Sequence, residues 1–504
     1  MCDQCRSRLN PSAPKETFTC VEAPAPAPTP SRRDVMTAGA GLLAGAAVAQ
    51  VTPSTAQAQG AADAELARVQ KARRVLLKGG IVLSLDPKVG DFANGDVLIE
   101  DGKIREVRPN IDASADAAVI VDASNRILIP GFVDTHSHSY QGLLRNSLPN
   151  GLVDPDYNRD VQNKWTPAYT PQDVYAGVLI TALGFIDMGT TAIIDLSQIS
   201  HTPEHSDACI KALQDAGIRA VYGYSRGAGP AMQWPQDIAR LQKTHFSSKD
   251  QLLTLALGAS LEAKVLAAAR EAGVPAVMHY RVNPAPGLAL GKAGVLREGD
   301  LFIHCTHLND EAWRMIKDIG GRISMSPPLE MAMAHGMPSV QDALDRGIRP
   351  SLSSDHGTTV AQDCFSMMRT VFNLQRLRVL QRRRNGETDT PQLVTCRDVL
   401  DFAMVQGARC ANIDGKVGTL TPGKEADILM LKADRIDIWP LNNAPSVVAN
   451  FMNPGHVENV FVGGKPKKWR GSLVGVDVPR VMRLAREARE GLMKRTNHQI
   501  DLLG

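Results

Sequence analysis

The sequence carries little net charge and few aromatic side chains. Its 504 residues have a formal net charge of +3, and aromatic residues make up 5% of them. Because the basic residues form no stripe and no aromatic residues alternate with them, we expect no nucleic-acid partner. Beyond the N-terminal segment no apolar run is long enough to cross a bilayer, so we expect no membrane span in the mature chain.

Cysteine is also scarce. A Cys-x-x-Cys pair at Cys2 and Cys5 could bind metal, but one pair with one distant partner, Cys20, is a weak signal. An odd and scattered set of cysteines follows residue 58, which predicts no disulfide framework. These residues are Cys209, Cys305, Cys364, Cys396 and Cys410.

Residues 1–58 predict a targeting segment that is cleaved from the mature protein. They contain a twin-arginine motif at Arg32-Arg33, a moderately apolar run at residues 35–51 and a small-x-small cleavage site at Ala56-Gln57-Ala58. The run is too short and too weakly apolar to anchor the chain in a membrane. We therefore expect export by the twin-arginine machinery, to the periplasm or the exterior. A cytosolic protein with an accidental arginine pair is the alternative.

The most informative motif is a pair of histidines, His136 and His138, at the end of the run at residues 127–138. Side chains two residues apart on a strand point to the same face, so both imidazoles would approach one point. Two nitrogen donors that converge in this way make half of a metal site. A solvated pair on a loop is the alternative, and the ligand-type residues that follow argue against it.

Three later apolar runs also end in ligand-type side chains, at His279, His304 and Asp355. In a (β/α)8 barrel the chemistry lies at the carboxyl ends of the strands. Further strands alternate with helical stretches, which predicts a parallel sheet and an α/β fold. The expected barrel strands lie at residues 127–138, 191–195, 218–224, 252–257, 275–279, 301–304, 322–326 and 350–355, with helices at residues 206–216, 261–272 and 310–319.

These motifs resemble those of the metal-dependent amidohydrolase superfamily. Residues 130–138 are similar to its first-strand motif. Residues 140–145 resemble the branch that contains cytosine deaminase, the triazine hydrolases and the adenosine-derivative deaminases. The resemblance spans residues 73–490 and includes residues 304–308, 353–355 and 418–428.

The resemblance also implies a small composite β-sandwich beside the barrel, built from both ends of the chain. Short alternating strands with glycine and Asp-Gly breaks agree with it, at residues 74–77, 81–83, 96–99 and 103–107 before the barrel and at residues 427–431 and 457–462 after it. The predicted parts are the targeting segment (1–58), the first sandwich part (73–127), the barrel (128–412), the second sandwich part (413–475) and a C-terminal helical segment (476–504, with the helix at 478–495).

The resemblance implies one divalent metal, with His136, His138 and His279 as ligands and Asp355 also in contact with it. Asp355 would accept a proton from the attacking water and later deliver it to the leaving nitrogen. His304 would polarise the substrate carbonyl or hold the attacking water, and a core histidine bonded to the backbone is the alternative. Imidazole and carboxylate ligands suit zinc, iron, manganese or cobalt, and zinc is the default on availability.

One position departs from that branch. Its deaminases carry a glutamate three residues after the fifth-strand histidine, where this sequence has Val282. Because a valine cannot transfer protons, the sequence argues against ring deamination by the usual route and favours hydrolysis of an amide, urea, lactam or amidine. Glu330, after the seventh strand, could substitute, although a loop carboxylate or a helix cap is the simpler role.

Three further residues are candidates for substrate binding. Gln141 and Arg145 follow the first strand and would line the pocket or pack its loop. Arg281 could anchor an anionic substrate or form a surface ion pair.

The expected function is hydrolysis of a non-peptide carbon–nitrogen bond in a small organic molecule by metal-activated water. A deaminase of an aminated heterocycle, a lyase or isomerase, and a non-catalytic binding protein on the same scaffold are the alternatives. Members of the family are often oligomeric, and a homo-oligomer is possible here, although no interface can be identified in the sequence.

Overall fold

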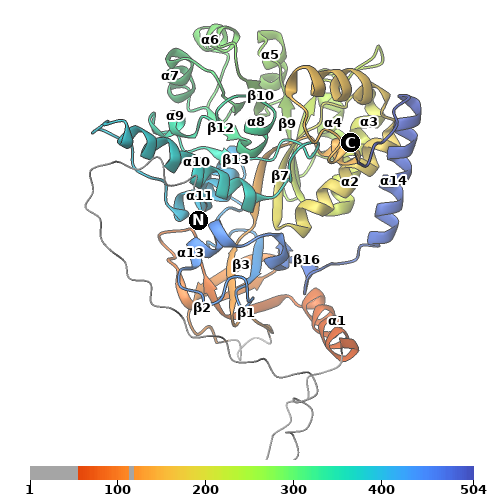
Figure 1. Cartoon of the computed structure of the whole chain (residues 1–504). Helices are drawn as coiled ribbons and strands as arrows, with labels where there is room; N and C mark the ends of the chain where they lie inside the picture. The colour runs from red at the N-terminus through yellow and green to blue at the C-terminus, as the bar shows by residue number, and fades with distance from the viewer. Residues whose placement is uncertain (1–54, 113–117, 504) are drawn as a thin grey trace, which may run out of the picture. The chain divides into compact units, whose positions relative to one another are not determined.

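The computed structural model describes residues 55–112 and 118–503, with side chains from residue 60 onward (Figure 1). The twin-arginine motif, the apolar run and the three N-terminal cysteines lie outside these residues. The expected cleavage site stands in the first turn of α1 (Thr55–Lys71). In the described part of the chain, no helix combines the length and apolar character that a bilayer crossing requires.

Eight parallel strands form the barrel, in an order that follows the chain from β6 to β13. The sheet closes where β6 meets β13, because Ser137 pairs with Asp355 and two backbone hydrogen bonds of 2.9 Å join His136 and His138 to Asp355. The predicted (β/α)8 barrel is confirmed. Its strands are β6 (Phe132–Ser137), β7 (Thr190–Leu196), β8 (Arg219–Ser225), β9 (Leu253–Gly258), β10 (Ala276–Tyr280), β11 (Leu301–His304), β12 (Arg322–Met325) and β13 (Ser351–Leu352).

Helices alternate with the strands and surround them (Figure 1). Local signals place their ends: Thr170 and Asp173 form a capping box at the start of α2, and Gly217 ends α3 with a φ of 67°. The helices are α2 (Pro171–Asp187), α3 (Pro203–Ala216), α4 (Ile238–His245), α5 (Ala263–Glu271), α6 (Ala285–Lys292), α7 (Asp310–Asp318), α8 (Pro327–Ala332), α9 (Val340–Leu344), α10 (Cys364–Arg384), α11 (Cys396–Ala403) and α12 (Val405–Cys410).

The loop after β6 is itself helical and carries part of the candidate site. It contains the short 3₁₀ helix η3 (Ser139–Leu144), the π-helical segment η4 (Val153–Trp165) and the 3₁₀ turn η5 (Thr166–Ala168). Side chains of η3 and η4 are buried against the barrel core. This loop therefore holds its polar side chains in fixed positions near the histidine pair.

A second, mixed sheet joins both ends of the chain, as the resemblance implied. β5 and β14 pair antiparallel, with Ile129 opposite Leu429. Apolar side chains from both arms of this sheet contact one another in one cluster, so the sheet encloses a core of its own. Its strands are β1 (Arg74–Val82), β2 (Phe92–Glu100), β3 (Lys103–Arg108), β4 (Val119–Asp122), β5 (Arg126–Pro130), β14 (Ile428–Lys432), β15 (Val457–Val462), β16 (Lys465–Trp469) and β17 (Ser472–Leu473).

Two expected strands are joined or divided differently in the structure. Residues 74–77 and 81–82 belong to the single strand β1, which ends at Val82 and whose register shifts around Gly80. Residues 127–138, expected as one barrel strand, divide into β5 of the mixed sheet and β6 of the barrel. The chain changes sheet at Gly131, where a Cβ would lie 2.0 Å from the Thr191 hydroxyl, so only glycine fits this close approach.

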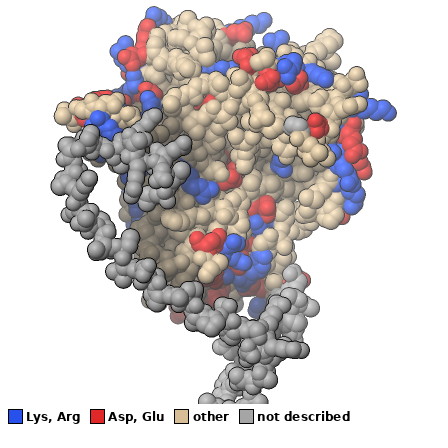
Figure 2. All heavy atoms as spheres, viewed as in Figure 1, with Lys and Arg blue, Asp and Glu red and all other residues tan. Residues whose placement is uncertain are grey.

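The remaining helices lie after the barrel, and α14 (Val478–Arg495) has the bounds that the sequence predicts for its last helix. An ion pair between Arg495 and Asp173 joins α14 to α2. Basic and acidic side chains are interspersed on the face that Figure 2 shows. The other short elements are α13 (Ala444–Ser446), η6 (Val447–Phe451) and η7 (Pro454–His456).

Candidate active site

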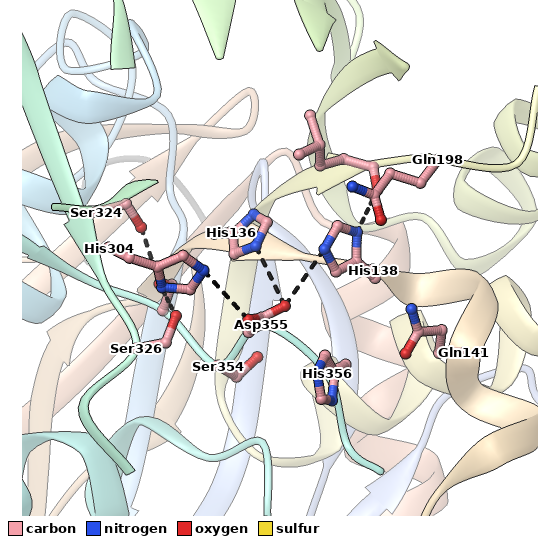
Figure 3. A network of polar contacts seen from close by, with 12 residues as sticks. His136, His138, Gln141, Gln198, His304, Ser324, Ser326, Ser354, Asp355 and His356 are labelled. Atoms are coloured by element: carbon pink, nitrogen blue, oxygen red, sulfur yellow. Dashed lines mark hydrogen bonds and ion pairs between the residues drawn. The ribbon is translucent and has the colours of Figure 1, made fainter. Parts of the chain in front are cut away.

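Four histidines and one aspartate meet at the carboxyl ends of the barrel strands, and Figure 3 labels all of them except His279. The ring of His136 lies 4.6 Å from that of His138, 4.9 Å from that of His279 and 5.6 Å from that of His304, between centroids. His279 is partly buried, and the other three histidines and Asp355 are buried. The structure thus brings together the five residues that the sequence proposes for metal binding and proton transfer.

The imidazoles converge on the carboxylate of Asp355. His136 Nε2 and His138 Nε2 lie 3.2 Å and 3.3 Å from Asp355 Oδ1, and His304 Nε2 lies 3.5 Å from Oδ2 (Figure 3). Burial raises the pKa of Asp355, but His356 and His136 lower it by more, so the pKa lies well below its usual value. The carboxylate is therefore ionised at neutral pH.

The tautomer of His138 follows from its second nitrogen. Nδ1 donates a hydrogen bond to the carbonyl oxygen of Leu196 at 2.8 Å, so Nε2 carries a lone pair when the ring is neutral. Burial, and then the neighbouring His136, lower the pKa of His138 to about 4. At neutral pH a lone pair therefore faces a carboxylate oxygen, an arrangement that a cation between them would stabilise.

The donor atoms fit a divalent metal ion. One ligand atom each from His136, His138 and His279 lie within 4.8 Å of one another, and the same holds for His136, His304 and Asp355. Both ring nitrogens of His136 and Oδ1 of Asp355 are buried and have no hydrogen-bond partner among the residues that the structure describes. Buried polar atoms normally have partners, and imidazole with carboxylate is a common ligand set for zinc.

A second layer of hydrogen bonds fixes the backbone that carries these ligands. Asp134 accepts from the amides of His136 and Ser354, both at 3.1 Å, and burial raises the pKa of Asp134 to about 7. Beneath the site, the Thr135 hydroxyl lies 2.7 Å from those of Ser324 and Ser351. The ligand positions are thus held from the barrel interior.

Several residues that follow the barrel strands have left-handed φ values. Such values are uncommon for residues other than glycine and are found at functional sites as well as in turns. Of the fifteen described non-glycine residues with such values, six follow barrel strands near the site: Gln198 (45°), Val282 (65°), His304 (68°), Cys305 (54°), His307 (61°) and Asp355 (61°).

Glu330 does not project freely over the barrel mouth. It lies in α8 at 0% exposure, where Oε1 accepts hydrogen bonds from His304 Nδ1 at 3.0 Å and from the Ser326 amide at 2.8 Å. Its second oxygen, Oε2, is buried without a hydrogen-bond partner. The carboxylate both caps α8 and orients His304, a contact that the sequence could not specify.

The proposed substrate-binding arginines occupy different places. Arg145 donates to the Ile180 carbonyl at 3.3 Å. It lines a separate pocket of about 500 Å³ with Asp187 and Gln362. The expectation that Arg145 binds the substrate is therefore wrong. Arg281 is partly exposed, and its charge lies close enough to contribute to the lowered pKa of His335, after burial and His304.

Two further histidines belong to the site and were not singled out in the sequence. The His335 ring lies 4.8 Å from that of His304, and its Nδ1 is buried without a partner. His356 follows Asp355 and stacks on Tyr157 with centroids 4.5 Å apart. Both follow the seventh and eighth strands, so the rule that locates barrel chemistry in these loops could have found them.

The other sequence candidates have simple places. Gln141 is buried in η3 beside His138. The side chain of Val282 is 58% exposed and carries no proton-transfer group. The five described cysteines are all free.

Two curated relatives align with most of the chain. The chain is 27% identical to a 5'-deoxyadenosine deaminase of Methanosarcina mazei, over 84% of this chain and 99% of the relative. It is 24% identical to a 5-methylthioadenosine/S-adenosylhomocysteine deaminase of Caldicellulosiruptor saccharolyticus, over 80% of this chain and 95% of the relative.

Solved structures show the same fold. An adenosine deaminase from Xanthomonas campestris with bound zinc superimposes with a TM-score of 0.73 at 19% identity, over 83% of this chain and 98% of that one. An atrazine chlorohydrolase from Arthrobacter aurescens in complex with zinc superimposes with a TM-score of 0.73 at 18% identity, over 82% of this chain and 100% of that one.

The family model for the amidohydrolase family matches residues 127–467. This range contains the whole barrel, the histidine cluster and the strands β14 and β15 of the mixed sheet. The chain therefore belongs to the amidohydrolase family and is a metal-dependent hydrolase of the type that acts on carbon–nitrogen bonds other than peptide bonds.

Proposed function

We propose that this protein uses one zinc ion to hydrolyse a carbon–nitrogen bond of an amide, urea, lactam or amidine in a small organic molecule. The observation that carries the proposal is the convergence of three unprotonated imidazoles and one ionised carboxylate at the carboxyl end of the barrel. His136, His138 and His279 would hold the ion together with Asp355. When bound there, a divalent ion lowers the pKa of a water molecule toward neutrality.

Asp355 is the proton carrier in this proposal. Its low pKa keeps it ionised, so it can accept a proton from the attacking water and deliver that proton to the leaving nitrogen. His304 supports the same step. Because Glu330 accepts the Nδ1 hydrogen of His304, the Nε2 lone pair faces Asp355 and can accept a hydrogen bond from the attacking water.

The residue at position 282 favours the first of the two substrate classes. Direct hydrolysis of an amide-type bond needs one proton carrier, and Asp355 can serve. Ring deamination needs a second one at the ring nitrogen, and Val282 offers none. The second candidate function, deamination of an aminated heterocycle such as an adenosine derivative, is favoured by the names of the relatives and would need another acid. Glu330, the second described carboxylate beside His304 after Asp355, would be that acid, since its Oε2 has no hydrogen-bond partner among the described residues.

The proposal extends to the location of the protein. The twin-arginine pair and the Ala56-Gln57-Ala58 site support export to the periplasm or the exterior. Replacing Arg32 and Arg33 by lysines should retain the protein in the cytoplasm. Equal export of both forms would contradict the proposal.

The test begins with metal content. The purified protein and its His136→Ala variant are analysed for zinc, iron, manganese and cobalt, and both are then assayed against cyclic amides, ureas and aminated heterocycles for ring opening and ammonia release. We expect about one zinc per chain, lost in the variant, and cleavage of an amide-type bond. Ammonia release from adenosine derivatives alone would favour the second candidate, and no metal in either protein after reconstitution would reject both.

A further inference from the structure

One pocket outside the active site is lined mainly by basic side chains. Its volume is about 320 Å³, and its lining includes Arg322, the first residue of β12, and Arg349, which closely precedes β13. This amino-end pocket therefore lies at the end of the barrel opposite the histidine cluster. Its charged lining residues are Lys317, Arg322, Arg349, Arg409 and Glu298.

Three of the four cations in this lining have no anionic partner. Arg349 forms ion pairs with Asp398 at 2.9 Å and with Asp401 at 2.8 Å. The others form no ion pair in the described part of the chain: Lys317 and Arg409, which are exposed, and Arg322, which is partly buried. Among the described residues that line the pocket Glu298 is the only acid, so positive charge is in excess.

Arg322 is held in place without losing its charge. Its guanidinium donates to Oδ1 of Asn412 at 2.8 Å, and the Asn412 amide donates in turn to the Gly299 carbonyl at 3.2 Å. Burial raises the pKa of the Cys410 thiol in the same lining, and the charges of Arg322 and Arg409 are among the groups that oppose this rise. Both guanidinium groups therefore lie near one part of the pocket.

A second pocket of similar size shows that such an excess is not general in this protein. A pocket of about 340 Å³ between α6 and α7 is lined by two basic residues, Lys292 and Arg314, and by two acidic residues, Glu311 and Asp318. Lys292 and Glu311 also form an ion pair of 3.3 Å. The charges of this second pocket balance, whereas those of the amino-end pocket do not.

We propose that the amino-end pocket binds a phosphate group, carried by a small organic molecule or free in solution. A guanidinium donates two parallel hydrogen bonds to a phosphate, and three cations without counter-ions favour a dianion over a monoanion. Pockets for small molecules begin at about 300 Å³, so a small organic group fits beside the phosphate. The inference does not depend on the proposed function, because no residue of the active site takes part.

Titration calorimetry on the zinc-loaded full chain, at constant ionic strength, tests the inference. The ligands are inorganic phosphate, glycerol 3-phosphate and, as a neutral control, glycerol. We expect both phosphates to bind and glycerol not to bind. Arg409→Met should weaken the binding of both phosphates about tenfold, as the loss of one charge-assisted hydrogen bond would give. Lys317→Met should weaken it about threefold and provides the test if Arg409→Met does not fold.

Two variants and one treatment control the result. Arg314→Met removes a cation from the balanced pocket and should leave both affinities unchanged. Glu298→Gln removes the acid from the amino-end pocket and should increase both affinities about threefold. Removal of zinc by a chelator should have no effect, because a phosphate bound at the metal would be lost with it.

Each outcome bears on the inference alone. Failure of the parent to bind either phosphate overturns it, and so does binding that Arg409→Met and Lys317→Met leave unchanged. Binding that disappears with zinc would locate the anion at the metal and would also overturn the inference. If these variants weaken binding, tighter binding of glycerol 3-phosphate identifies an organic phosphate, and equal binding identifies the free ion. Carbon–nitrogen hydrolysis is measured separately, so a failed titration leaves the proposed function intact.

Discussion

The two ends of the barrel differ in whether their buried polar side chains are paired. At the amino ends of the strands, Arg219 makes hydrogen bonds of 3.0 Å and 2.9 Å to Asp427, and Arg270 pairs with Asp300. At the carboxyl ends, several buried polar atoms have no hydrogen-bond partner in the described part of the chain: ring nitrogens of His136, His304 and His335 and oxygens of Gln141, Glu330 and Asp355.

The difference indicates what each end is for. The Arg219–Asp427 pair joins the barrel to the mixed sheet, the Arg270–Asp300 pair lies within the barrel, and each pair offsets part of the free energy lost when its charges leave water. Unpaired acceptors at the carboxyl ends cost stability in the free protein and become useful when a cation and a substrate supply the missing partners. Mutations that are chemically alike should therefore affect stability at one end and catalysis at the other.

The largest expected effect comes from Asp355→Asn. Removal of a general base that also acts as general acid should lower kcat by a factor of about 10² to 10⁴. The three histidine ligands should retain most of the metal. The measurements are steady-state kinetics on the substrate found by screening and zinc content by elemental analysis.

The matched change at the other end is Asp300→Asn. Asp300 is buried and accepts from Arg270 and from the amides of Ala276 and Arg297. The Asp300→Asn variant should be less stable than the parent and should turn over substrate at the parental rate.

Turnover of Asp355→Asn at a rate near that of the parent would reject the assignment of Asp355.

Arg219→Met should produce the largest loss of stability at the amino end. It leaves Asp427, which is also buried, without its ion-pair partner, so the free energy of unfolding should fall by about 3–5 kcal/mol. Urea denaturation measures the change. Arg108→Met, at an exposed pair with Glu106, should cost no more than about 1 kcal/mol, and equal losses in the two variants would contradict the contrast between buried and exposed pairs.

Acid should destabilise the carboxyl end of the metal-free protein. Burial, the first cause in each case, lowers the pKa of His138 and of His356 to about 4 from an ordinary value of 6.5. The unfolded chain then binds more protons between pH 6.5 and 4, so stability is fully present above pH 6.5 and falls as the pH drops through 4. Asp134 acts in the opposite direction, because its pKa is raised to about 7. Its contribution to stability is present at low pH and is lost as the pH rises through 7.

The net expected change is a loss of stability between pH 6.5 and 4, because the lowered pKa values of His136, His279 and His335 act in the same direction as those of His138 and His356. Urea denaturation of the metal-free protein at several pH values measures it. A double variant, His138→Gln with His356→Gln, should have a flatter profile. Stability that rises on acidification would contradict the neutral, buried state of these rings.

The sequence predicted the parts of this contrast that depend on local pattern. Apolar runs that end in His279, His304 and Asp355 predicted both the strands and the end of the barrel where their side chains meet, because strand direction alone determines that end. The sequence could not show which charged residues form ion pairs at the amino ends. Arg219 and Asp427 are 208 residues apart, and only the packing of the mixed sheet against the barrel brings them together.

Contacts within the site were harder to predict for the same reason. Glu330 was a candidate on its position after the seventh strand, yet its hydrogen bond to His304 depends on the turn that starts α8. His335 and His356 lie in loops whose course no periodicity specifies. The division of residues 127–138 between two sheets was also missed, because a continuous apolar run gives no sign of which sheet each half joins.

The smallest expected effect tests the link between Glu330 and His304. Glu330→Gln keeps an oxygen that can accept from His304 Nδ1 and removes the negative charge that strengthens this hydrogen bond. We expect kcat to fall about tenfold with little change in KM, because the charge is worth on the order of 1.4 kcal/mol to the orientation of the ring. Glu330→Asp, which keeps the charge but shortens the reach, should recover only part of the loss.

The comparison variant at the amino end is Glu425→Gln, which removes the same charge from the partly exposed member of the Arg219 cluster. It should lower stability by no more than about 1 kcal/mol and leave kcat unchanged, since Asp427 still pairs with Arg219. If Glu330→Gln instead lowered stability and left kcat unchanged, the Glu330 carboxylate would serve α8 as a cap alone, and the orientation of His304 would have to come from its strained backbone and the rings around it.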